Sequence, residues 1–477
     1  MPSGFVGRQR ELDELKEFLD AVRKGRRAGA RGLAVAVRGR RRVGKSSLVT
    51  EFVRRASVPH VHFQAARGAT GAAQLAALMD AVATSNLPNA AVADGAGPGT
   101  LAAALRILGA ALPTDGPAIV VIDELPWLLE AIASGAGELQ GVWDTDLSKR
   151  PVLLILLGSD LSMMERLDHY GEPFHGRATP MILRELSPRD VATMTGLTGV
   201  AAFDAFLITG GQPLVTTDWD HGEAPDSFLE RSLSRSTSAL IVQGARILDS
   251  EFPPETHPRA VLTAIGGRGE RAYTGILQSL NGLLSSATLD RALHLLADKR
   301  VITADDPLST KLASKDRRWR VSDPALRFWL AAVEPSLADV DRGRPDLAVQ
   351  RIRANFTTWR GRAIEPIVRD ALQRLLPDDQ WTKVHEVGGW WPRTNTPEVD
   401  LVGADRRPAK SISFVGTIKW REGSPLDRHD VDRLATDAVG VHGVGAGTPL
   451  VGVCPAGGND KRLAQVWDAD DLLSAWR

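Results

Sequence analysis

The chain has 477 residues, of which 43% are hydrophobic and 24% are charged. These proportions are typical of a soluble globular protein and exclude a long disordered chain or a collagen-like fibre. Lys plus Arg and Asp plus Glu each number 58, so the formal net charge is zero, which excludes a polybasic nucleic-acid binder but not a local basic patch.

The cysteine content and the apolar runs indicate the compartment. A single cysteine, Cys454, rules out a disulfide framework within the chain and a zinc site built from several thiolates. The first residues contain no apolar signal core, and the longest apolar run, at 152–157, is far shorter than the roughly 20 residues of a membrane helix. We therefore expect a cytoplasmic protein with no membrane partner.

Short apolar runs alternate with helical segments in the first part of the chain. The expected strands are 32–38, 60–64, 118–122, 152–157 and 181–183, and the expected helices are 46–56, 71–83 and 99–112. Strands separated by helices pair in parallel, so the fold class is α/β with a parallel sheet. We assign this domain to residues 1–186.

The pattern becomes helical after residue 187, which predicts a helical lid over 187–254. Short helices at 259–265, 274–280 and 288–298, followed by strands at 301–304 and 318–321, outline a winged helix over 255–334. Residues 335–345 are interpreted as a linker. Mixed strands and helices over 350–477 predict a further α/β domain.

The segment 39–46 fits the pattern G-x-x-x-x-G-K-[ST] at every position, after an apolar strand and before a helix. The glycines let backbone N–H groups curl around a phosphate, and the start of the following helix favours negative charge. Lys45 would reach the phosphates, and the Ser46 hydroxyl would bind Mg²⁺. The expected cofactors are ATP and Mg²⁺, and the expected nucleotide contacts are Gly39, Arg40, Arg41, Arg42, Val43, Gly44, Lys45, Ser46 and Ser47. The arginine run either attracts the nucleotide or forms a solvated rim.

Two carboxylates follow the apolar strand at 118–122. Asp123, at the strand's end, would hold Mg²⁺, and Glu124 would act as general base toward the attacking water. Their place on a separate strand, about 80 residues after the phosphate loop, completes the pattern of a P-loop ATPase.

The chain also resembles the archaeal-type, AAA-like ATPases, a branch close to the STAND class. The segment Phe5-Val6-Gly7-Arg8 resembles their adenine-side segment, which implies that Phe5, Val6 and Arg8 contact the base. Residues 152–164 resemble the strand that carries a polar γ-phosphate contact, here Ser159. Alternatively, Ser159 caps the next helix.

Two later motifs extend the resemblance. Gly176-Arg177 implies that Arg177 senses the γ-phosphate, and Gly210-Gly211-Gln212-Pro213 implies that Pro213 lies near the base. Alternatively, Arg177 is a surface arginine or pairs with Glu172, and Pro213 only breaks a helix.

The winged-helix segment leaves DNA binding open. The helix at 288–298 carries Arg291 and His294 but also Asp290 and Asp298, which would repel phosphates. In related ATPases such a module often packs as a regulatory lever instead. A ribbon that could touch DNA phosphates carries Lys311, Lys315, Arg317, Arg318 and Arg320.

Residues 350–477 resemble the PD-(D/E)xK nuclease-like domains attached to such ATPases. The resemblance implies Glu365, Asp400 and Lys419 as site residues, but the acid expected two positions before the lysine is Thr417. A hydroxyl cannot replace the second charged oxygen ligand that Mg²⁺ prefers, unless Glu398 substitutes for it. We therefore expect a degenerate domain without nuclease activity.

Together these features predict a Mg²⁺- and ATP-binding switch that hydrolyses ATP slowly. The alternatives are an ATP-gated DNA nuclease and an ATP-regulated DNA-binding regulator. DNA, a protein partner and a second copy of the chain all remain open as partners.

Overall fold

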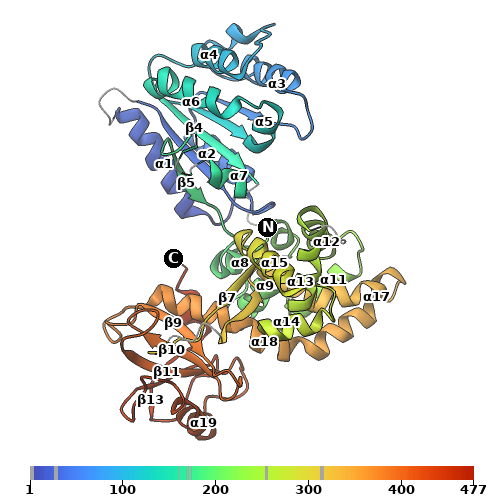
Figure 1. The fold of residues 1–477 in the computed structure, drawn as a ribbon, viewed down its shortest axis with the longest axis vertical. Helices are drawn as coiled ribbons and strands as arrows, with labels where there is room; N and C mark the ends of the chain where they lie inside the picture. Colours follow the sequence, from blue (N-terminus) through green and yellow to red (C-terminus); the bar gives the residue numbers. More distant parts are fainter. Residues whose placement is uncertain are drawn as a thin grey trace. The chain divides into compact units, whose positions relative to one another are not determined.

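The structure is a computed structural model that describes residues 5–25, 31–159, 161–167, 169, 171–172, 174–252, 256–311 and 316–476. The chain divides into two compact units (Figure 1). The N-terminal unit comprises Gly7–Glu185, and the C-terminal unit comprises Leu186–Arg477 together with Met1–Val6.

The N-terminal unit is built on a five-stranded parallel sheet in the order β2-β3-β4-β1-β5. The apolar strands β3 and β4 are buried at every position because helices cover the sheet. The sheet confirms the α/β class. Its strands are β1 (Leu33–Arg38), β2 (His60–Gln64), β3 (Ala118–Asp123), β4 (Val152–Gly158) and β5 (Ala178–Ile182).

Helices pack on this sheet through Leu- and Ala-rich faces. One core joins the strands to α3, α4, α5 and α6, and α1 packs against α2 and β4. The hydroxyls of Thr70 and Thr100 accept backbone N–H bonds and cap α3 and α4. The helices are α1 (Gln9–Lys24), α2 (Lys45–Ala56), α3 (Gly71–Ala83), α4 (Leu101–Ala111), α5 (Leu125–Ala131), α6 (Gly135–Thr145) and α7 (Leu161–Arg166).

The C-terminal unit begins with helices and continues into a small antiparallel sheet. The first helices are α8 (Pro188–Thr195), α9 (Gly199–Thr209), α10 (Pro213–Thr217), α11 (Pro225–Leu233) and α12 (Ala239–Glu251). The sheet has the order β6-β8-β7. It is formed with α13 (His257–Ile265), β6 (Arg271–Ala272), α14 (Tyr273–Ser279), α15 (Ser286–Asp298), β7 (Ile302–Asp305) and β8 (Arg318–Val321).

The linker prediction for 335–345 is wrong, because this stretch is helical. A 3₁₀ turn over Glu334–Ser336 leads into α17 (Leu337–Asp341), and α18 starts at Pro345. The prolines stand in the first turns of helices, where their missing N–H costs nothing. Leu337 and Val340 pack against the core, which anchors the segment.

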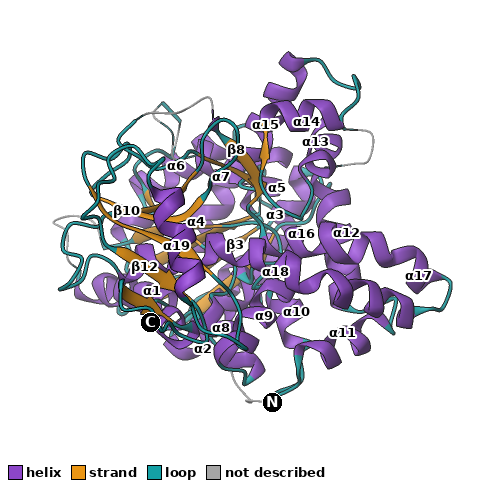
Figure 2. Ribbon diagram, turned by 90° about the horizontal axis from the view of Figure 1, so that it is seen from below, coloured by secondary structure: helices purple, strands orange, loops and turns teal. Residues whose placement is uncertain are grey.

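The unit ends in a mixed five-stranded sheet in the order β13-β12-β11-β10-β9. Strands β9, β10 and β11 pair antiparallel, and β11, β12 and β13 pair parallel. The long helix α18 lies beside α9 (Figure 2). The elements are α16 (Pro324–Phe328), α18 (Pro345–Leu375), β9 (Glu386–Trp390), β10 (Val399–Ala404), β11 (Ile412–Ile418), α19 (Arg428–Ala438), β12 (Leu450–Val453), β13 (Leu463–Trp467) and α20 (Ala469–Leu473).

A continuous core runs through the C-terminal unit. Phe203 of α9 packs edge-on against Trp420 and Trp476, with ring centroids 5.1 and 6.3 Å away. Aromatic pairs of this geometry add to the stability gained from burial. The helices that follow Leu186 and the final sheet are therefore parts of one folded body.

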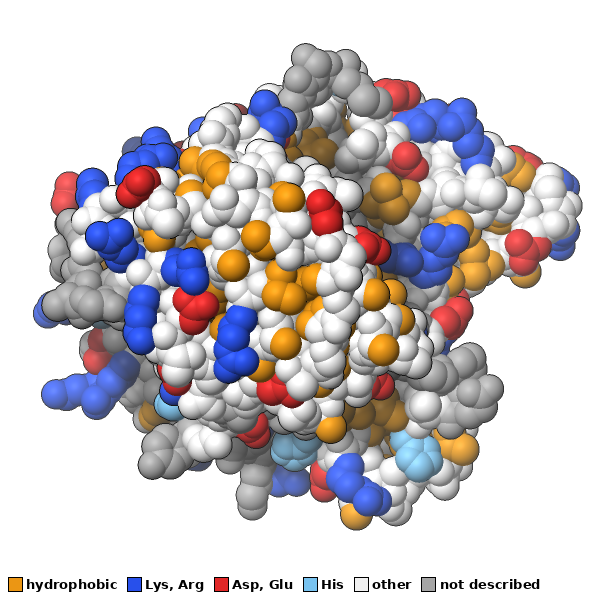
Figure 3. Space-filling view, turned by 90° about the horizontal axis from the view of Figure 1, so that it is seen from above, with side chains coloured by type: hydrophobic (Ala, Val, Ile, Leu, Met, Phe, Trp, Pro, Cys, Tyr) orange, Lys and Arg blue, Asp and Glu red, His pale blue; other side chains and the backbone are white. Residues whose placement is uncertain are grey.

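Among the described residues, no single helix has the length and apolar composition needed to cross a membrane, and one pair, α8 and α9, bent by 105°, meets that test together. On the face of the molecule seen in Figure 3, positive and negative side chains are interspersed.

Candidate nucleotide-binding site

The predicted phosphate loop connects β1 to α2, and its glycines meet steric requirements. A Cβ added to Gly39 would lie 2.4 Å from the carbonyl oxygen of Leu183. Gly44 has a φ of 89°, in the left-handed region that favours glycine. The sequence pattern therefore forms a tight loop directly before a helix.

Arg8 braces this loop from the start of α1. Its Nη2 donates to the carbonyl oxygen of Val43 at 3.0 Å and also to that of Arg184, and the residue is only 7% exposed. Arg8 thus fixes the loop backbone. The role predicted for it toward the base remains a prediction, as do those of Phe5 and Val6, which belong to the other unit.

The Lys45 ammonium is buried inside the loop. Its Nζ donates to the carbonyl oxygens of Gly39 at 2.8 Å and Arg40 at 3.0 Å. No side chain caps the start of α2, because the capping position is Gly44. A cation and the positive end of a helix therefore lie at one place, which is the arrangement that binds phosphate.

The arginine run divides between interior and surface. Arg40 is buried, Arg41 is half-buried, and Arg42 is exposed, as is Ser47. The solvated-rim interpretation therefore fits Arg42 but not Arg40.

Ser46 and Asp123 lie together, as predicted for two groups that share a metal ion. The Ser46 hydroxyl donates to Asp123 Oδ2 at 2.6 Å, and Asp123 is 3% exposed. Burial raises the pKa of Asp123. Hydrogen bonds from His62, Ser46 and the Glu124 N–H outweigh this effect, so the pKa lies below its usual value. Asp123 is therefore a buried but ionised carboxylate.

His62 is a site residue that sequence reasoning missed. Its Nε2 lies 3.8 Å from Asp123 Oδ2. It reaches that position because β2 pairs with β3 in parallel, with His62 opposite Val121. The only sequence signal was a polar residue in the middle of a predicted strand.

Glu124 and Ser159 are in direct contact. The Ser159 hydroxyl donates to Glu124 Oε1 at 2.7 Å, and the Ser159 N–H donates to Oε2 at 3.3 Å. Glu124 has a φ of 53°, which is uncommon for a residue with a side chain and is typical of functional sites. The structure thus brings both predicted residues together, at the ends of β3 and β4.

Arg177 and Pro213 are placed differently from these residues. Arg177 forms a bidentate ion pair with Asp144 of α6, with distances of 2.8 and 2.7 Å, rather than with Glu172. Pro213 occupies the first turn of α10 in the C-terminal unit. Their roles toward a nucleotide remain predictions.

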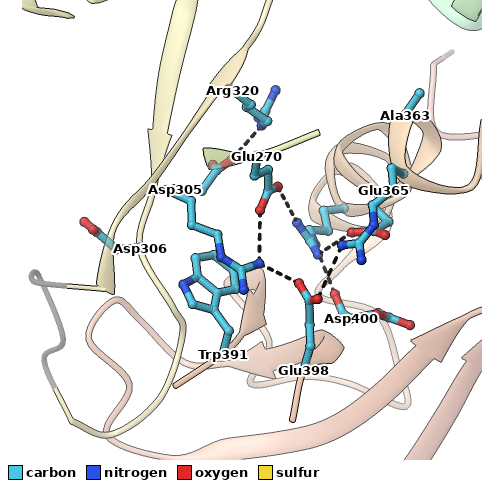
Figure 4. Close-up of polar contacts among 12 residues, drawn as sticks. Glu270, Asp305, Asp306, Arg320, Ala363, Glu365, Trp391, Glu398 and Asp400 are labelled. Atoms are coloured by element: carbon cyan, nitrogen blue, oxygen red, sulfur yellow. Dashed lines mark hydrogen bonds and ion pairs between the residues drawn. The ribbon is translucent and has the colours of Figure 1, made fainter. Parts of the chain in front are cut away.

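Three acids of the predicted nuclease-like site, Glu365, Glu398 and Asp400, lie in a second cluster (Figure 4). Thr417 Oγ1 donates to Asp400 Oδ2 at 2.9 Å, and the Ile418 N–H donates to the same oxygen at 2.8 Å. Asp400 Oδ2 therefore already accepts two hydrogen bonds from β11. The described hydrogen bonds of Lys419 are made by its backbone, whose N–H donates to the carbonyl oxygen of Val453 and whose carbonyl oxygen accepts from the Arg421 N–H.

An arginine lies among the acids of this cluster. Arg369 Nη2 contacts Glu365 Oε2 at 3.2 Å, and its Nε donates to the backbone oxygen of Asp400 at 3.0 Å. Burial, with Asp400 and Glu270 nearby, raises the pKa of Glu365 to about 7, although Arg369 opposes the shift. The Arg369 guanidinium thus contacts both the carboxylate of Glu365 and the backbone of Asp400.

Glu398 is also neutralised by arginines. Its carboxylate contacts Arg318 at 2.7 Å and Arg362 at 3.4 Å, and the Arg318 guanidinium lies 4.2 Å from the Trp391 ring centroid. Among the described residues, no group of three or more His, Cys, Asp or Glu side chains could hold a metal ion. These contacts do not support the hypothesis that Glu398 supplies the metal ligand missing at Thr417.

The ribbon that could face DNA is largely paired within the chain. Arg317 forms a bidentate pair with Asp306 at 2.9 Å, and Arg320 contacts Asp305 at 2.6 Å. Arg318 is buried in the cluster just described. Lys315 lies outside the described residues, and for Lys311 the described contacts join its backbone to Ser309.

Comparison with known proteins agrees with the N-terminal site. Residues 4–154 match a family model described as an AAA ATPase domain, and residues 329–434 match one described as archaeal and bacterial proteins of unknown function. An uncharacterized protein of Methanocaldococcus jannaschii is 24% identical over 444 residues, which is 91% of this chain and 90% of that protein.

Two archaeal proteins of solved structure match the chain at low similarity. A Walker-type ATPase of Pyrococcus abyssi has a TM-score of 0.48 at 18% identity, covering 68% of this chain and 96% of that chain. The ORC2 protein of Aeropyrum pernix, in ADPNP and ADP complexes, has a TM-score of 0.43 at 14% identity, covering 74% and 96%. The match to the AAA ATPase model spans the phosphate loop, Asp123 and Glu124.

Proposed function

We propose that this protein is a Mg²⁺-dependent ATPase that works as a slow molecular switch. The observation that carries the proposal is the convergence of Lys45, Ser46, Asp123 and Glu124 at the carboxyl ends of the strands of one parallel sheet. Ligands of open α/β sheets bind at this edge. The site combines a buried cation, a hydroxyl, an ionised carboxylate and a restrained second carboxylate.

The donor set fits ATP with Mg²⁺. The Ser46 hydroxyl and the Asp123 carboxylate are hard oxygen donors only 2.6 Å apart, and the lowered pKa keeps Asp123 charged. When bound, the metal ion would neutralise the charge of the phosphates. Lys45 would exchange the carbonyl oxygens of Gly39 and Arg40 for phosphate oxygens, and Arg8 would keep the loop in shape.

Glu124 is the proposed general base, and its contact with Ser159 supports slow turnover. A base must accept a proton from water with its carboxylate. Here both oxygens of Glu124 already accept hydrogen bonds from Ser159. We expect turnover to require that Ser159 releases Glu124, for example when its hydroxyl turns to the γ-phosphate.

For the C-terminal unit we propose a winged helix followed by a degenerate nuclease-like domain. The element order α13, β6, α14, α15, β7, β8 supports the first, and α18 followed by β9, β10 and β11 supports the second. The arginines beside Glu365 and Asp400 favour a packing role over DNA cleavage, and the paired ribbon arginines disfavour DNA binding. We place this switch in the reducing cytoplasm, where the single Cys454 stays a thiol.

Calorimetric titration with ATP and Mg²⁺ tests the nucleotide site. Lys45→Ala should abolish binding at concentrations that saturate the wild type, because the variant lacks the phosphate-binding cation. Lys16→Ala, which removes an exposed lysine of α1, is the matched control and should bind normally. Unchanged affinity in Lys45→Ala would refute the site.

A further inference from the structure

A cavity of about 290 Å³ lies inside the C-terminal unit, between α16, the turn that follows it, and α18. Its walls combine aromatic rings with arginines, and no Asp or Glu is among the described residues that line it. The proposed ATPase chemistry does not use this cavity. The lining residues that carry the argument are Arg268, Phe328, Arg351, Phe356, Trp359 and Arg362.

One wall is a fixed aromatic surface. Trp359 lies 5.2 Å from Phe328 and 5.7 Å from Phe356, measured between ring centroids. The Trp359 Nε1 donates to the carbonyl oxygen of Gly267 at 2.9 Å, which fixes the indole. Trp359 is 8% exposed and Phe356 is half-buried, so a planar guest could stack on rings that are already ordered.

Small residues and an irregular helix keep the space open. Trp329–Val333 forms a π-helical turn, a distortion that is frequent at functional sites, and its Ala331 and Ala332 line the cavity. A Cβ on Gly267 would lie 2.0 Å from the carbonyl oxygen of Arg327. The absence of a side chain at Gly267 therefore lets the loop that carries Arg268 pack closely against Arg327 and Ala331.

Three guanidinium groups surround the aromatic wall, each with a different degree of restraint. Arg351 is held by Asp339 at 2.8 Å, and Arg362, 57% exposed, has only a long contact of 3.4 Å to Glu398. Arg268 is exposed and has no acceptor among the described residues. An anion in the cavity could therefore form an ion pair with Arg268. It could also pair with Arg362, because only the long contact to Glu398 would be lost.

We propose that this cavity binds a small planar anion, meaning an aromatic ring system that carries a phosphate or carboxylate group. Stacking on Trp359 and Phe356 selects the ring, and the guanidinium groups select the charge, since they suit both phosphate and carboxylate geometry. The volume is at the lower end of that of ligand pockets, which suits a mononucleotide-sized molecule rather than a larger one.

The proposal is tested by calorimetry on the full chain carrying Lys45→Ala, which silences the phosphate loop. The ligands are the four nucleoside monophosphates, their 3′,5′-cyclic forms, benzoate and indole-3-carboxylate, with ribose 5-phosphate as the anion without an aromatic ring. Arg268→Gln is introduced into the same background. Arg235→Gln, at an exposed arginine that does not line the cavity, is the control.

At least one aromatic anion should bind with a stoichiometry of one, and the phosphate and carboxylate arms show which source fits. Arg268→Gln should weaken that binding roughly tenfold or more, because it removes a charged hydrogen-bond donor, while Arg235→Gln should not. No binding across the set at millimolar concentration would overturn the proposal. So would binding that Arg268→Gln leaves unchanged, or equal binding of ribose 5-phosphate.

Discussion

At the scale of single residues, the site depends on which partner each charged group has. Lys45, Ser46 and Asp123 were predictable because their motif fixes both sequence and local structure. The partners of Arg8, Glu124 and Arg177 were not, because each lies more than 30 residues away along the chain. Pairings of this kind depend on sheet order, which local patterns do not encode.

Arg177 offers a prediction at this scale, because Asp144 holds it in a bidentate pair. If Arg177 contacts the γ-phosphate during turnover, Arg177→Ala should slow hydrolysis by about 100-fold, since charged donors at developing phosphate charge are worth that much or more. Asp144→Asn should leave turnover equal or faster because it frees Arg177. Steady-state rates at saturating ATP decide the question. Wild-type turnover in Arg177→Ala would make the pair purely structural.

At the scale of elements, the strands predicted from apolar runs agree well with the structure, whereas the linker predicted from prolines does not. Strands β3 and β4 follow continuous apolar stretches and begin at the predicted residues, and β2 and β8, which mix polar and apolar residues, have the predicted bounds. Pro335 and Pro345 suggested a linker, but each begins a helix whose neighbours pack into the core. A proline marks a boundary without saying on which side the helix lies.

Glu365 of α18 makes the stability of the C-terminal unit depend on pH. Its pKa is about 7 in the folded chain, against an ordinary value of 4.5 for a glutamate side chain, so between these values the native state holds the extra proton. Stability should therefore fall as pH rises from about 5 to 8, by about 1–3 kcal/mol. Denaturant unfolding at several pH values measures this change.

Glu365→Gln is the variant that isolates this effect, because the amide stays neutral and can still accept a bond from Arg369. It should flatten the dependence between about pH 5 and 8. Glu230→Gln, at a carboxylate that is 55% exposed, should keep the wild-type slope. An unchanged slope in Glu365→Gln would assign the pH dependence to another group.

At the scale of the whole molecule, we propose that the C-terminal unit carries a degenerate nuclease-like domain that has lost its metal chemistry. Thr417 donates a hydrogen bond to the carboxylate of Asp400, and Arg369 donates one to the carboxylate of Glu365. A metal ion would compete with these donors for the carboxylate oxygens. We expect no cleavage of plasmid DNA with Mg²⁺ or Mn²⁺, with or without ATP. Gel assays of the purified chain check this. Robust cleavage that disappears in Asp400→Ala would make the ATP-gated nuclease the better account.

The central claim is that Glu124 drives Mg²⁺-dependent ATP hydrolysis in the N-terminal unit. The most direct measurement compares ATP affinity and turnover in the wild type, Glu124→Gln and Glu130→Gln, the last at an exposed carboxylate of α5. The account predicts that Glu124→Gln binds ATP as tightly as the wild type but turns it over at least about 100-fold more slowly, while Glu130→Gln behaves normally. Wild-type turnover in Glu124→Gln, or no Mg²⁺-dependent hydrolysis by the unmodified chain, would contradict it.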